Sequence, residues 1–271
     1  MDWTEYASNI QELLNLKGEP VAITYSMHRA FGALKGKHRI CDSLLLANNG
    51  ETIDLTLNTC ACPGGSWHVG LGQYPEGEQF KVAQDFLVKR EKIYCSIAVF
   101  HRMKTLNPPP PTGLADHIVL APLRKAEFQP DAVLFICNAE QACRLVTLDS
   151  YETGIAPKVQ MSGSTCYQTI TYPVVSGELN VSLMDYTSRQ IRGFKPEDMV
   201  VSIPYNRFLN IIRNADKCAA GRADILMPQP VLAALSEYYN WAVPIAAGYR
   251  KSEDWLRKYS NVVKGYLRKV A

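Results

Sequence analysis

The chain has 271 residues, of which 47% are hydrophobic and 20% charged, so it is long and apolar enough to bury a sizeable core without disulfide staples. Its formal net charge of +3, from 29 basic and 26 acidic residues, argues against the strongly basic surface typical of nucleic-acid-binding proteins. No apolar run approaches the roughly 20 residues that cross a bilayer. We therefore expect a soluble protein with no nucleic-acid or membrane partner.

The chain opens with a helix, a strand and a second helix. Residues 3–16 place apolar side chains at helical spacing, and residues 21–25 are typical of a strand. A helix is predicted over residues 39–47, ending before Gly50. Cys41 would then lie near the N-terminus of this helix, where the helix dipole favours a thiolate.

The next segment brings two cysteines to a turn between a strand and a helix. Residues 52–57 alternate between apolar and polar side chains, as in a half-buried strand. They lead into Cys60 and Cys62, and a short helix is expected over residues 66–71. Cys60 and Cys62 should therefore share one strand-to-helix turn.

Beyond this turn, residues 79–89 are expected to be helical, while the apolar segment 91–103 fits a helix and a strand equally well. Four consecutive prolines then force an extended stretch, which we interpret as a surface loop over residues 104–114.

The remainder predicts a sheet covered by helices, because its strands are continuous apolar runs. The expected strands span residues 118–121, 132–136, 179–183 and 199–203. The expected helices span residues 139–151, 205–214, 230–241 and 253–270. The predicted fold class is mixed α/β, with a central sheet flanked by helices and a helical C-terminal third. A single domain over residues 1–271 is expected, and a two-lobed arrangement around the surface loop stays open.

Eight cysteines are present, although the N-terminus has no basic head followed by an apolar run that would direct export. We therefore expect a cytoplasmic protein with reduced thiols, in which accumulated cysteine indicates metal binding or thiol chemistry. Cys41, Cys62 and Cys166 stand out because glycine and polar residues surround them. The other cysteines apart from Cys60 are expected to be packed or incidental thiols, namely Cys95, Cys137, Cys143 and Cys218.

The segment from Cys60 to Gly65 suits a metal cluster. Gly64 and Gly65 would let backbone amides approach a sulfur-rich ligand, and a proline directly after a cysteine is common beside iron-sulfur ligands. A C-x-C pair is nevertheless a weaker signal than the C-x-x-C pairs of zinc sites. Spacing alone therefore leaves both a metal site and metal-free thiols open.

Other familiar signatures are absent from the sequence. The glycines at positions 64–72 do not complete a dinucleotide-binding motif, and there is no phosphate-binding loop, serine-hydrolase elbow or zinc-protease helix. His68 is the histidine nearest to the cysteine turn, and a surface or supporting role is expected for it. Arg189 could balance the charge of a cluster or substrate, and a surface ion pair is the alternative.

A series of short motifs in a fixed order resembles the prokaryotic domain-of-unknown-function family 169. The resemblance covers residues 21–214 and rests on Arg39-Ile40-Cys41, Cys62-Pro63-Gly64-Gly65, Gly70-Leu71-Gly72, Ala121-Pro122-Leu123, Asp131-Ala132-Val133-Leu134-Phe135 with Gln141, Cys166, Asn180-Val181-Ser182-Leu183 with Ser188-Arg189, and Val200-Val201-Ser202-Ile203-Pro204.

The resemblance implies a protein of archaea and bacteria, often anaerobes, and supports Cys41, Cys62 and Cys166 as a set. The resemblance also implies that many members carry a further cysteine in the region where this chain has Asp185-Tyr186, so a fourth ligand is not expected from that region. Cys60 is the expected substitute. Such thiolates, gathered from distant points of the chain, could hold a four-iron four-sulfur cluster, because soft sulfur ligands select such clusters.

The sequence thus predicts an iron-sulfur protein of anaerobic metabolism, either an electron carrier or an accessory enzyme, with Cys41, Cys60, Cys62 and Cys166 as metal ligands. Its partner would be a redox protein or a small molecule, and association into homo-oligomers stays open. One alternative is a metal-free protein whose cysteines line a small-molecule pocket or sense redox state. Another is a zinc-bound structural module.

Overall fold

The computed structural model describes residues 3–73, 77–161 and 164–221. Residues 1–222 form one compact unit, which contains all of these residues, and residues 223–271 form a second. The helices predicted over residues 230–241 and 253–270 lie outside the described residues. Among the described helices, none combines the length and the apolar character needed to span a bilayer.

A six-stranded sheet lies at the centre of the first unit, with the strand order β2-β3-β1-β4-β6-β5. Every pair of neighbouring strands is antiparallel. The strands are β1 (Val21–Ser26), β2 (Ile53–Leu55), β3 (His117–Pro122), β4 (Ala132–Cys137), β5 (Asn180–Ser182) and β6 (Met199–Pro204). The sheet and its surrounding helices confirm the mixed α/β class.

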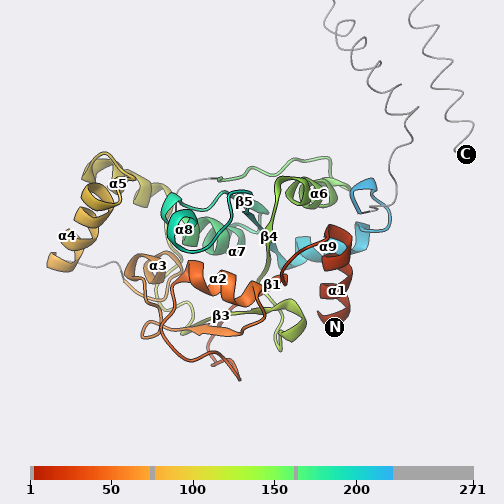
Figure 1. Cartoon of the computed structure of the whole chain (residues 1–271), viewed down its shortest axis with the longest axis horizontal. Helices are drawn as coiled ribbons and strands as arrows, with labels where there is room; N and C mark the ends of the chain where they lie inside the picture. Colours follow the sequence, from red (N-terminus) through yellow and green to blue (C-terminus); the bar gives the residue numbers. More distant parts are fainter. Residues whose placement is uncertain (1–2, 74–76, 162–163, 222–271) are drawn as a thin grey trace, which may run out of the picture. The chain divides into compact units, whose positions relative to one another are not determined.

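One face of the sheet is covered by α1 (Trp3–Leu14), α6 (Ala139–Ser150) and α9 (Tyr205–Asn214). Side chains alternate between the faces along a strand, so Val133 and Phe135 of β4 point to this side, where Phe135 packs against Phe208 of α9 with ring centroids 6.2 Å apart. Cys137 and Cys218 are buried in the same cluster. In Figure 1 these three helices lie to one side of β1 and β4.

The opposite face is covered by a second set of short helices: α2 (Ile40–Asn48), α3 (Pro63–His68), η3 (Tyr167–Thr171), α7 (Tyr172–Ser176) and α8 (Tyr186–Ile191). Ala132 and Leu134 of β4 point to this side and join its apolar cluster. Cys41, Cys60 and Cys166 pack against that same cluster. The sheet therefore separates these cysteines from Cys137 and Cys218.

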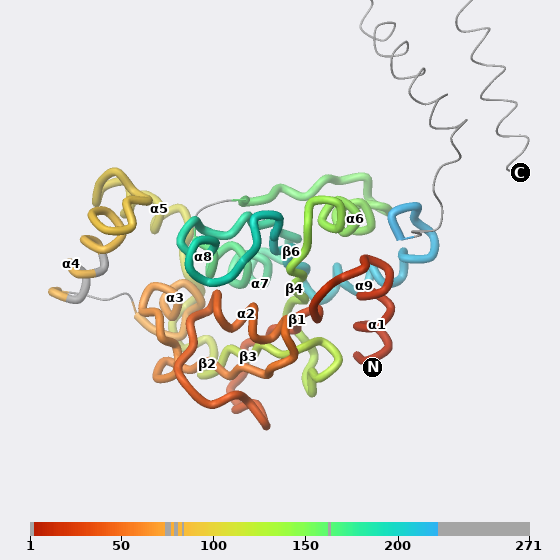
Figure 2. The backbone as a smooth tube through the Cα atoms, in the orientation of Figure 1, coloured from red at the N-terminus to blue at the C-terminus, as the bar shows by residue number. Residues whose placement is uncertain are grey.

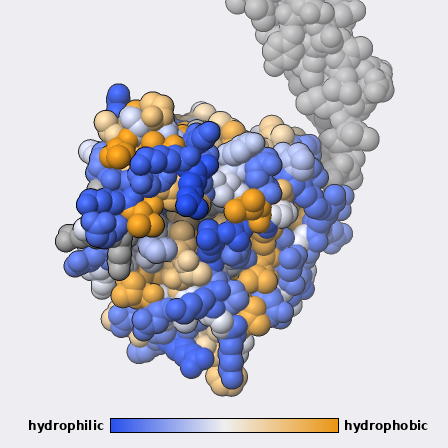
Figure 3. All heavy atoms as spheres, turned by 60° about the vertical axis from the view of Figure 1, so that its left-hand side comes forward, coloured by the Kyte–Doolittle hydropathy of each residue, from blue (hydrophilic) through white to orange (hydrophobic). Residues whose placement is uncertain are grey.

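Two further connections complete the described fold. The first runs through α4 (Gly77–Asp85), the π-helix η1 (Phe86–Arg90) and α5 (Ile97–Leu106), so the ambiguous segment 91–103 is partly helical. The second is the proline stretch, which has no regular structure and packs against the end of α3, where Gly113 N–H donates to the Gly70 carbonyl at 3.2 Å. On the face drawn in Figure 3, small hydrophobic groups are separated by hydrophilic residues.

Short one-turn helices connect other elements: η2 (Leu123–Lys125) follows β3 and η4 (Ala219–Gly221) follows α9. The long segment between β1 and α2 has no regular secondary structure apart from a single bridge, and it passes beside β2 and β3 (Figure 2). Leu34 N–H donates to the Thr52 carbonyl at 2.8 Å and fastens this segment next to β2.

Candidate functional site

Cysteines from three separate parts of the chain meet on the face covered by α2 and α3. Cys41 occupies the first turn of α2, Cys60 and Cys62 precede α3, and Cys166 lies at the start of the helical segment that becomes η3. All four side chains are partly buried, and all eight cysteines of the chain are free thiols. The structure thus brings together the four cysteines singled out in the sequence.

The proximity of the four thiols is evident in the pKa of Cys166. Burial raises this pKa most, and negative charge on Cys62, Cys41 and Cys60 raises it further. Coulombic influence of this kind requires the sulfur atoms to lie near one another, because it decays with distance and is screened by water. Cys166 is therefore the thiol whose pKa depends on the charge of the other three.

Gly65 allows the closest approach within this group. A Cβ atom at this position would lie 3.3 Å from Cys62 Cβ, 3.5 Å from Cys166 Sγ and 3.1 Å from the Ile40 side chain. Gly65 N–H also donates a hydrogen bond to Cys62 Sγ at 3.3 Å. Gly64, by contrast, is exposed and has open space where its Cβ would lie. Of the two glycines predicted to admit a cofactor, Gly65 is the one that lies among the thiols.

Local backbone contacts determine where Cys60 and Cys62 lie. Cys62 is the N-cap of α3, and Pro63 begins the helix, as is common at the first helical position. Cys60 S–H donates to the Cys62 carbonyl at 3.5 Å. A parallel bridge joins Cys60 to His38, where His38 N–H donates to the Thr59 carbonyl at 3.0 Å. The turn carrying Cys60 is therefore tied to the segment that leads into α2 and Cys41.

Asp185 organises the side of the site formed by Cys166 and Cys41. Its carboxylate accepts hydrogen bonds from the Thr165 hydroxyl, the Ser188 N–H at 2.8 Å and the Ser188 hydroxyl at 2.9 Å. Thr165 directly precedes Cys166, while Ser188 hydrogen-bonds to Cys41 and thereby lowers its pKa. The Asp185 carboxylate thus links the helix that carries Cys166 to α8, whose Ser188 contacts Cys41.

Burial outweighs the helix dipole in setting the protonation of these thiols. Cys41 occupies the first turn of α2, where the helix dipole favours a thiolate. Its pKa is nevertheless raised, first by burial and then by the charge of Asp42. Burial likewise raises the pKa of Cys60 to about 11. The expectation of a thiolate at Cys41 is therefore wrong for the metal-free protein, because a raised pKa favours the neutral thiol.

Two arginines that the sequence did not single out supply positive charge near the thiols. Arg192 lowers the pKa of Cys41 and lies 3.6 Å from the Asp42 carboxylate, and Arg39 lowers the pKa of Cys60. Arg189 instead donates to backbone carbonyls, namely those of Leu183, Lys195, Pro196 and Asp198. Arg39 begins the predicted helix and belongs to the motif Arg39-Ile40-Cys41, although no charge-balancing role was expected for it, whereas no sequence signal marked Arg192.

The backbone is irregular immediately after Cys166. Residues 167–171 form a π-helix inside a longer helical stretch, an arrangement that is rare and often accompanies functional sites. The Thr171 hydroxyl donates to the His68 carbonyl at 2.6 Å and joins this π-helix to the end of α3. His68 itself is buried, and burial lowers its pKa to about 4.

A turn before α5 approaches the same side. Glu91 hydrogen-bonds to Thr187, and burial raises the pKa of its carboxyl. The pKa of Tyr94 is raised by burial and by the charges of Asp185 and Glu91. The turn thus adds two polar side chains near Asp185.

The donors gathered at this site are thiols, which are soft ligands. The four cysteines influence one another electrostatically, a backbone N–H points to Cys62 Sγ, and the missing side chain of Gly65 avoids a close contact with Cys62 and Cys166. Among the described residues, no group of three or more His, Cys, Asp or Glu side chains is placed to hold a metal ion. A single tetrahedral zinc ion would need sulfur atoms about 3.8 Å apart. Thiolates that hold a cubane each bind a different iron and lie farther apart.

Comparison with known proteins identifies a matching family and a similar protein. The model of DUF169, described as uncharacterised ArCR, matches residues 9–214, and so includes all four cysteines. An uncharacterised protein, MJ0308, of Methanocaldococcus jannaschii is 24% identical over 234 residues, which cover 77% of this chain and 91% of the relative. No solved structure matches the chain.

Proposed function

The chain belongs to the uncharacterised DUF169 family, and from that premise we propose that it binds a four-iron four-sulfur cluster through Cys41, Cys60, Cys62 and Cys166. Its role would be electron transfer or that of an accessory enzyme in the cytoplasm of an anaerobe. A redox protein or a small molecule would be its partner.

The proposal rests chiefly on one observation: Cys41, Cys60 and Cys166 pack against one apolar cluster, and a Cβ at Gly65 would touch both Cys62 and Cys166, although these cysteines come from three segments of the chain. Buried cysteines packed at random would not be expected to gather on one face of the sheet while Cys137 and Cys218 lie on the other. Convergence of distant thiols is what a cluster site requires when local spacing does not provide it.

The surroundings also suit a charged cluster. Gly65 N–H donates to Cys62 Sγ, and hydrogen bonds to sulfur are among the factors that tune cluster potentials. Arg39 and Arg192 lower the pKa of Cys60 and Cys41 and so favour the deprotonated ligands. A bound cluster would supply one-electron transfer, or Lewis-acid chemistry if Cys60 left one iron open.

The metal-free redox sensor has less support. Sensor cysteines are exposed and have lowered pKa values, which make them nucleophilic. Here burial raises the pKa of Cys41, Cys60 and Cys166, so these thiols would react slowly.

The direct test is anaerobic purification followed by visible absorption spectroscopy and quantification of iron and sulfide. We expect a brown protein with about four iron and four sulfide per chain. Serine variants of Cys41, Cys62 and Cys166 should lose most of the iron. The Cys60→Ser variant should keep a less stable centre if the other three thiolates still hold it.

Matched controls come from the remaining cysteines. Cys95→Ser and Cys143→Ser change exposed thiols outside the site and should leave the iron content unchanged. A colourless wild-type protein without iron, after strictly anaerobic purification and reconstitution with iron and sulfide, would overturn the proposal. Equal iron loss in the control variants would also contradict the ligand assignment.

A further inference from the structure

A pocket of about 380 Å³ lined by both polar and apolar groups lies beside β2 and β3. Its walls are the segment between β1 and α2 and the turn that follows β2. The charged and titratable side chains that line it are those of Arg29, Lys35, Asp54 and His117. None of them is among the cysteine ligands proposed above.

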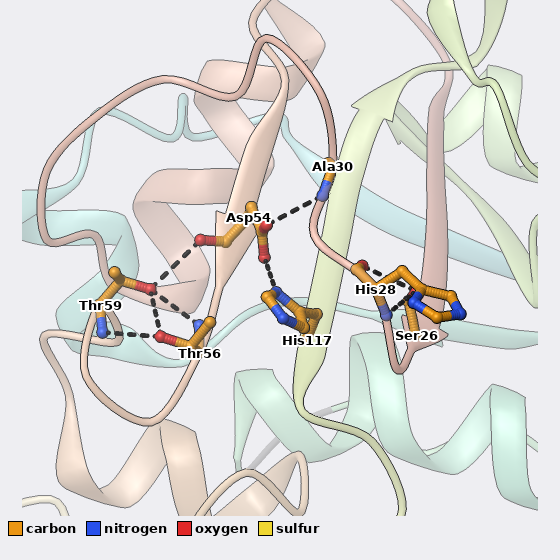
Figure 4. Close-up of polar contacts among 7 residues, drawn as sticks. All are labelled: Ser26, His28, Ala30, Asp54, Thr56, Thr59 and His117. Atoms are coloured by element: carbon orange, nitrogen blue, oxygen red, sulfur yellow. Dashed lines mark hydrogen bonds and ion pairs between the residues drawn. The ribbon is translucent and has the colours of Figure 1, made fainter.

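Asp54 and His117 form a half-buried pair in the lining of this pocket. Asp54 Oδ1 lies 2.7 Å from His117 Nδ1, and the two side chains are only 7% and 18% exposed. Asp54 Oδ2 accepts a second hydrogen bond from Ala30 N–H at 3.0 Å. Figure 4 shows Asp54 between Ala30 and His117, which come from opposite sides of it.

This pairing determines how the imidazole can serve the pocket. An ionised carboxylate only accepts hydrogen bonds, so His117 Nδ1 must carry the proton that it shares with Asp54. Nε2, on the other side of the ring, then accepts a hydrogen bond from a hydroxyl when the ring is neutral and donates one to an anionic oxygen when the ring is protonated. A histidine held in one tautomer by a carboxylate is a common arrangement where the ring must bind a ligand or move a proton.

The pocket lining carries more cations than carboxylates. Arg29 and Lys35 line the pocket and are exposed, and the segment from residue 27 to 39 also contains Lys37 and Arg39 but no Asp or Glu. The one carboxylate of the pocket, Asp54, is engaged by Ala30 N–H and His117. The electrostatic field therefore favours an anion, and a guanidinium pairs well with the planar oxygens of carboxylate or phosphate.

Hydrogen bonds hold both walls of the pocket in place. The Thr59 hydroxyl donates to the Asp54 carbonyl at 3.2 Å, and Thr56 N–H donates to the Thr59 hydroxyl at 2.8 Å (Figure 4). On the other wall, Leu34 N–H and His38 N–H donate to carbonyls of the β2 segment. The same turn continues into Cys60, which places the pocket next to the thiol site along the chain.

We propose that this pocket binds a small organic oxyanion, a carboxylate or a phosphate ester, whose charged group contacts Arg29 and Lys35 and whose nearer atoms contact His117 Nε2. Asp54 would be the positioning residue that holds the imidazole. The site is independent of cluster binding, since it uses none of the proposed ligands.

The test is a titration of the ¹⁵N-labelled full chain, in which NMR spectra monitor the ring nitrogen signals of His117. Inorganic phosphate and succinate are added separately at constant ionic strength. We expect a saturable shift with at least one of them, with a Kd of about 1 mM or tighter, the range of a small-ligand site. The Arg29→Ala/Lys35→Ala double variant should bind at least about tenfold more weakly, equivalent to 1.4 kcal/mol.

The matched control is Lys81→Ala/Lys89→Ala, which also removes two exposed cations, each paired only with a neighbour on its own helical stretch. It should bind as the wild type does. Asp54→Asn should alter the ring nitrogen shifts of His117 before any anion is added, because the tautomer is no longer fixed. Thermal midpoints establish that each variant is folded.

Saturation with phosphate alone would identify a phosphate ester, and saturation with succinate alone a carboxylate. The absence of any saturable His117 shift with both anions would overturn the proposal, as would undiminished binding by the folded Arg29→Ala/Lys35→Ala variant. Both anion titrations are made on metal-free protein, so their result does not depend on whether the protein binds an iron-sulfur cluster.

Discussion

Thr165 and Asp185 are joined by a reciprocal pair of hydrogen bonds: the Thr165 hydroxyl donates to the Asp185 carboxylate, and Asp185 N–H donates to the same hydroxyl at 2.7 Å. Thr165 is 2% exposed and adjoins Cys166, while Asp185 caps α8. The pair therefore fixes the start of the Cys166 helix against the helix whose Ser188 contacts Cys41.

Replacing Thr165 with valine should destabilise the protein. The substitution exchanges the hydroxyl for a methyl group of similar size and leaves polar groups of Asp185 without this partner. The expected loss is about 1–3 kcal/mol of unfolding free energy, measured by urea denaturation. Thr165→Ser keeps the hydroxyl and should recover most of that loss. Thr105→Val is the control, since Thr105 is exposed and bonds only within α5. A Thr165→Val loss no larger than that of Thr105→Val would contradict the assigned role.

Gly65 and Gly64 form a matched pair for testing the space among the thiols. Gly65→Ala would place a Cβ 3.1 Å from Ile40 and 3.3 Å from Cys62, so neighbouring groups must move, at a typical cost of about 1–3 kcal/mol. Gly64→Ala meets nothing within 4 Å. We expect Gly65→Ala to lower both the unfolding free energy and the iron content after reconstitution, and Gly64→Ala to change neither. Equal behaviour of the two variants would exclude a spatial requirement at Gly65.

The raised pKa values predict slow alkylation of Cys41, Cys60 and Cys166 in metal-free protein. The pKa of Cys60 moves from its usual 9.0 to about 11 because of burial. At pH 7 its thiolate fraction should be about 100-fold lower, since each pKa unit is a factor of ten. Mass spectrometry after iodoacetamide treatment should therefore find Cys95 and Cys143 modified first. Modification of Cys60 at the rate of Cys95 would show that its environment is not the buried one described.

His68 should make stability depend on pH. Burial lowers its pKa from 6.5 to about 4, so the unfolded chain binds more protons than the folded one between these values. Stability is then complete above about pH 6.5 and falls as the pH drops towards 4, by at most about 3 kcal/mol. The difference in unfolding free energy between wild type and His68→Gln should change across this window. His28→Gln, at an exposed position, should show no such change.

Long, strongly periodic elements were predictable from sequence. The helix predicted over residues 205–214 coincides with α9, and the predicted strands 118–121, 132–136 and 199–203 lie within β3, β4 and β6. The antiparallel direction of every pairing was not predictable, because a continuous apolar run indicates burial on both faces and says nothing of its neighbours.

Elements that differ from expectation are governed by local hydrogen bonds. The strand predicted over residues 52–57 ends at Leu55, since Thr56 and Thr59 exchange hydrogen bonds and turn the chain. Ser96 caps α5 by accepting from Val99 N–H at 3.3 Å, a signal present in the ambiguous segment 91–103. The short helix expected over residues 66–71 begins at Pro63 instead, with Cys62 as its cap.

The four candidate cysteines were identifiable because glycine and small polar residues surround them, and the structure brings them together. Asp185, Thr165, Ser188 and Arg192 were not identified, because their roles depend on tertiary contacts between α2, α8 and the Cys166 helix. The sequence separates α2 from the other two by more than a hundred residues, and Thr165 from Asp185 by 20. Sequence pattern can identify the donor atoms, but the groups that orient them depend on tertiary packing.

The π-helix at residues 167–171 holds one more residue per turn than the α-helix on either side of it. Deleting a single residue there would restore a regular helix, but it would rotate Cys166 about 100° around the helix axis relative to α7. The extra residue in this turn therefore contributes to the direction in which Cys166 faces. Its removal would make the helix more regular and turn Cys166 away from the other thiols.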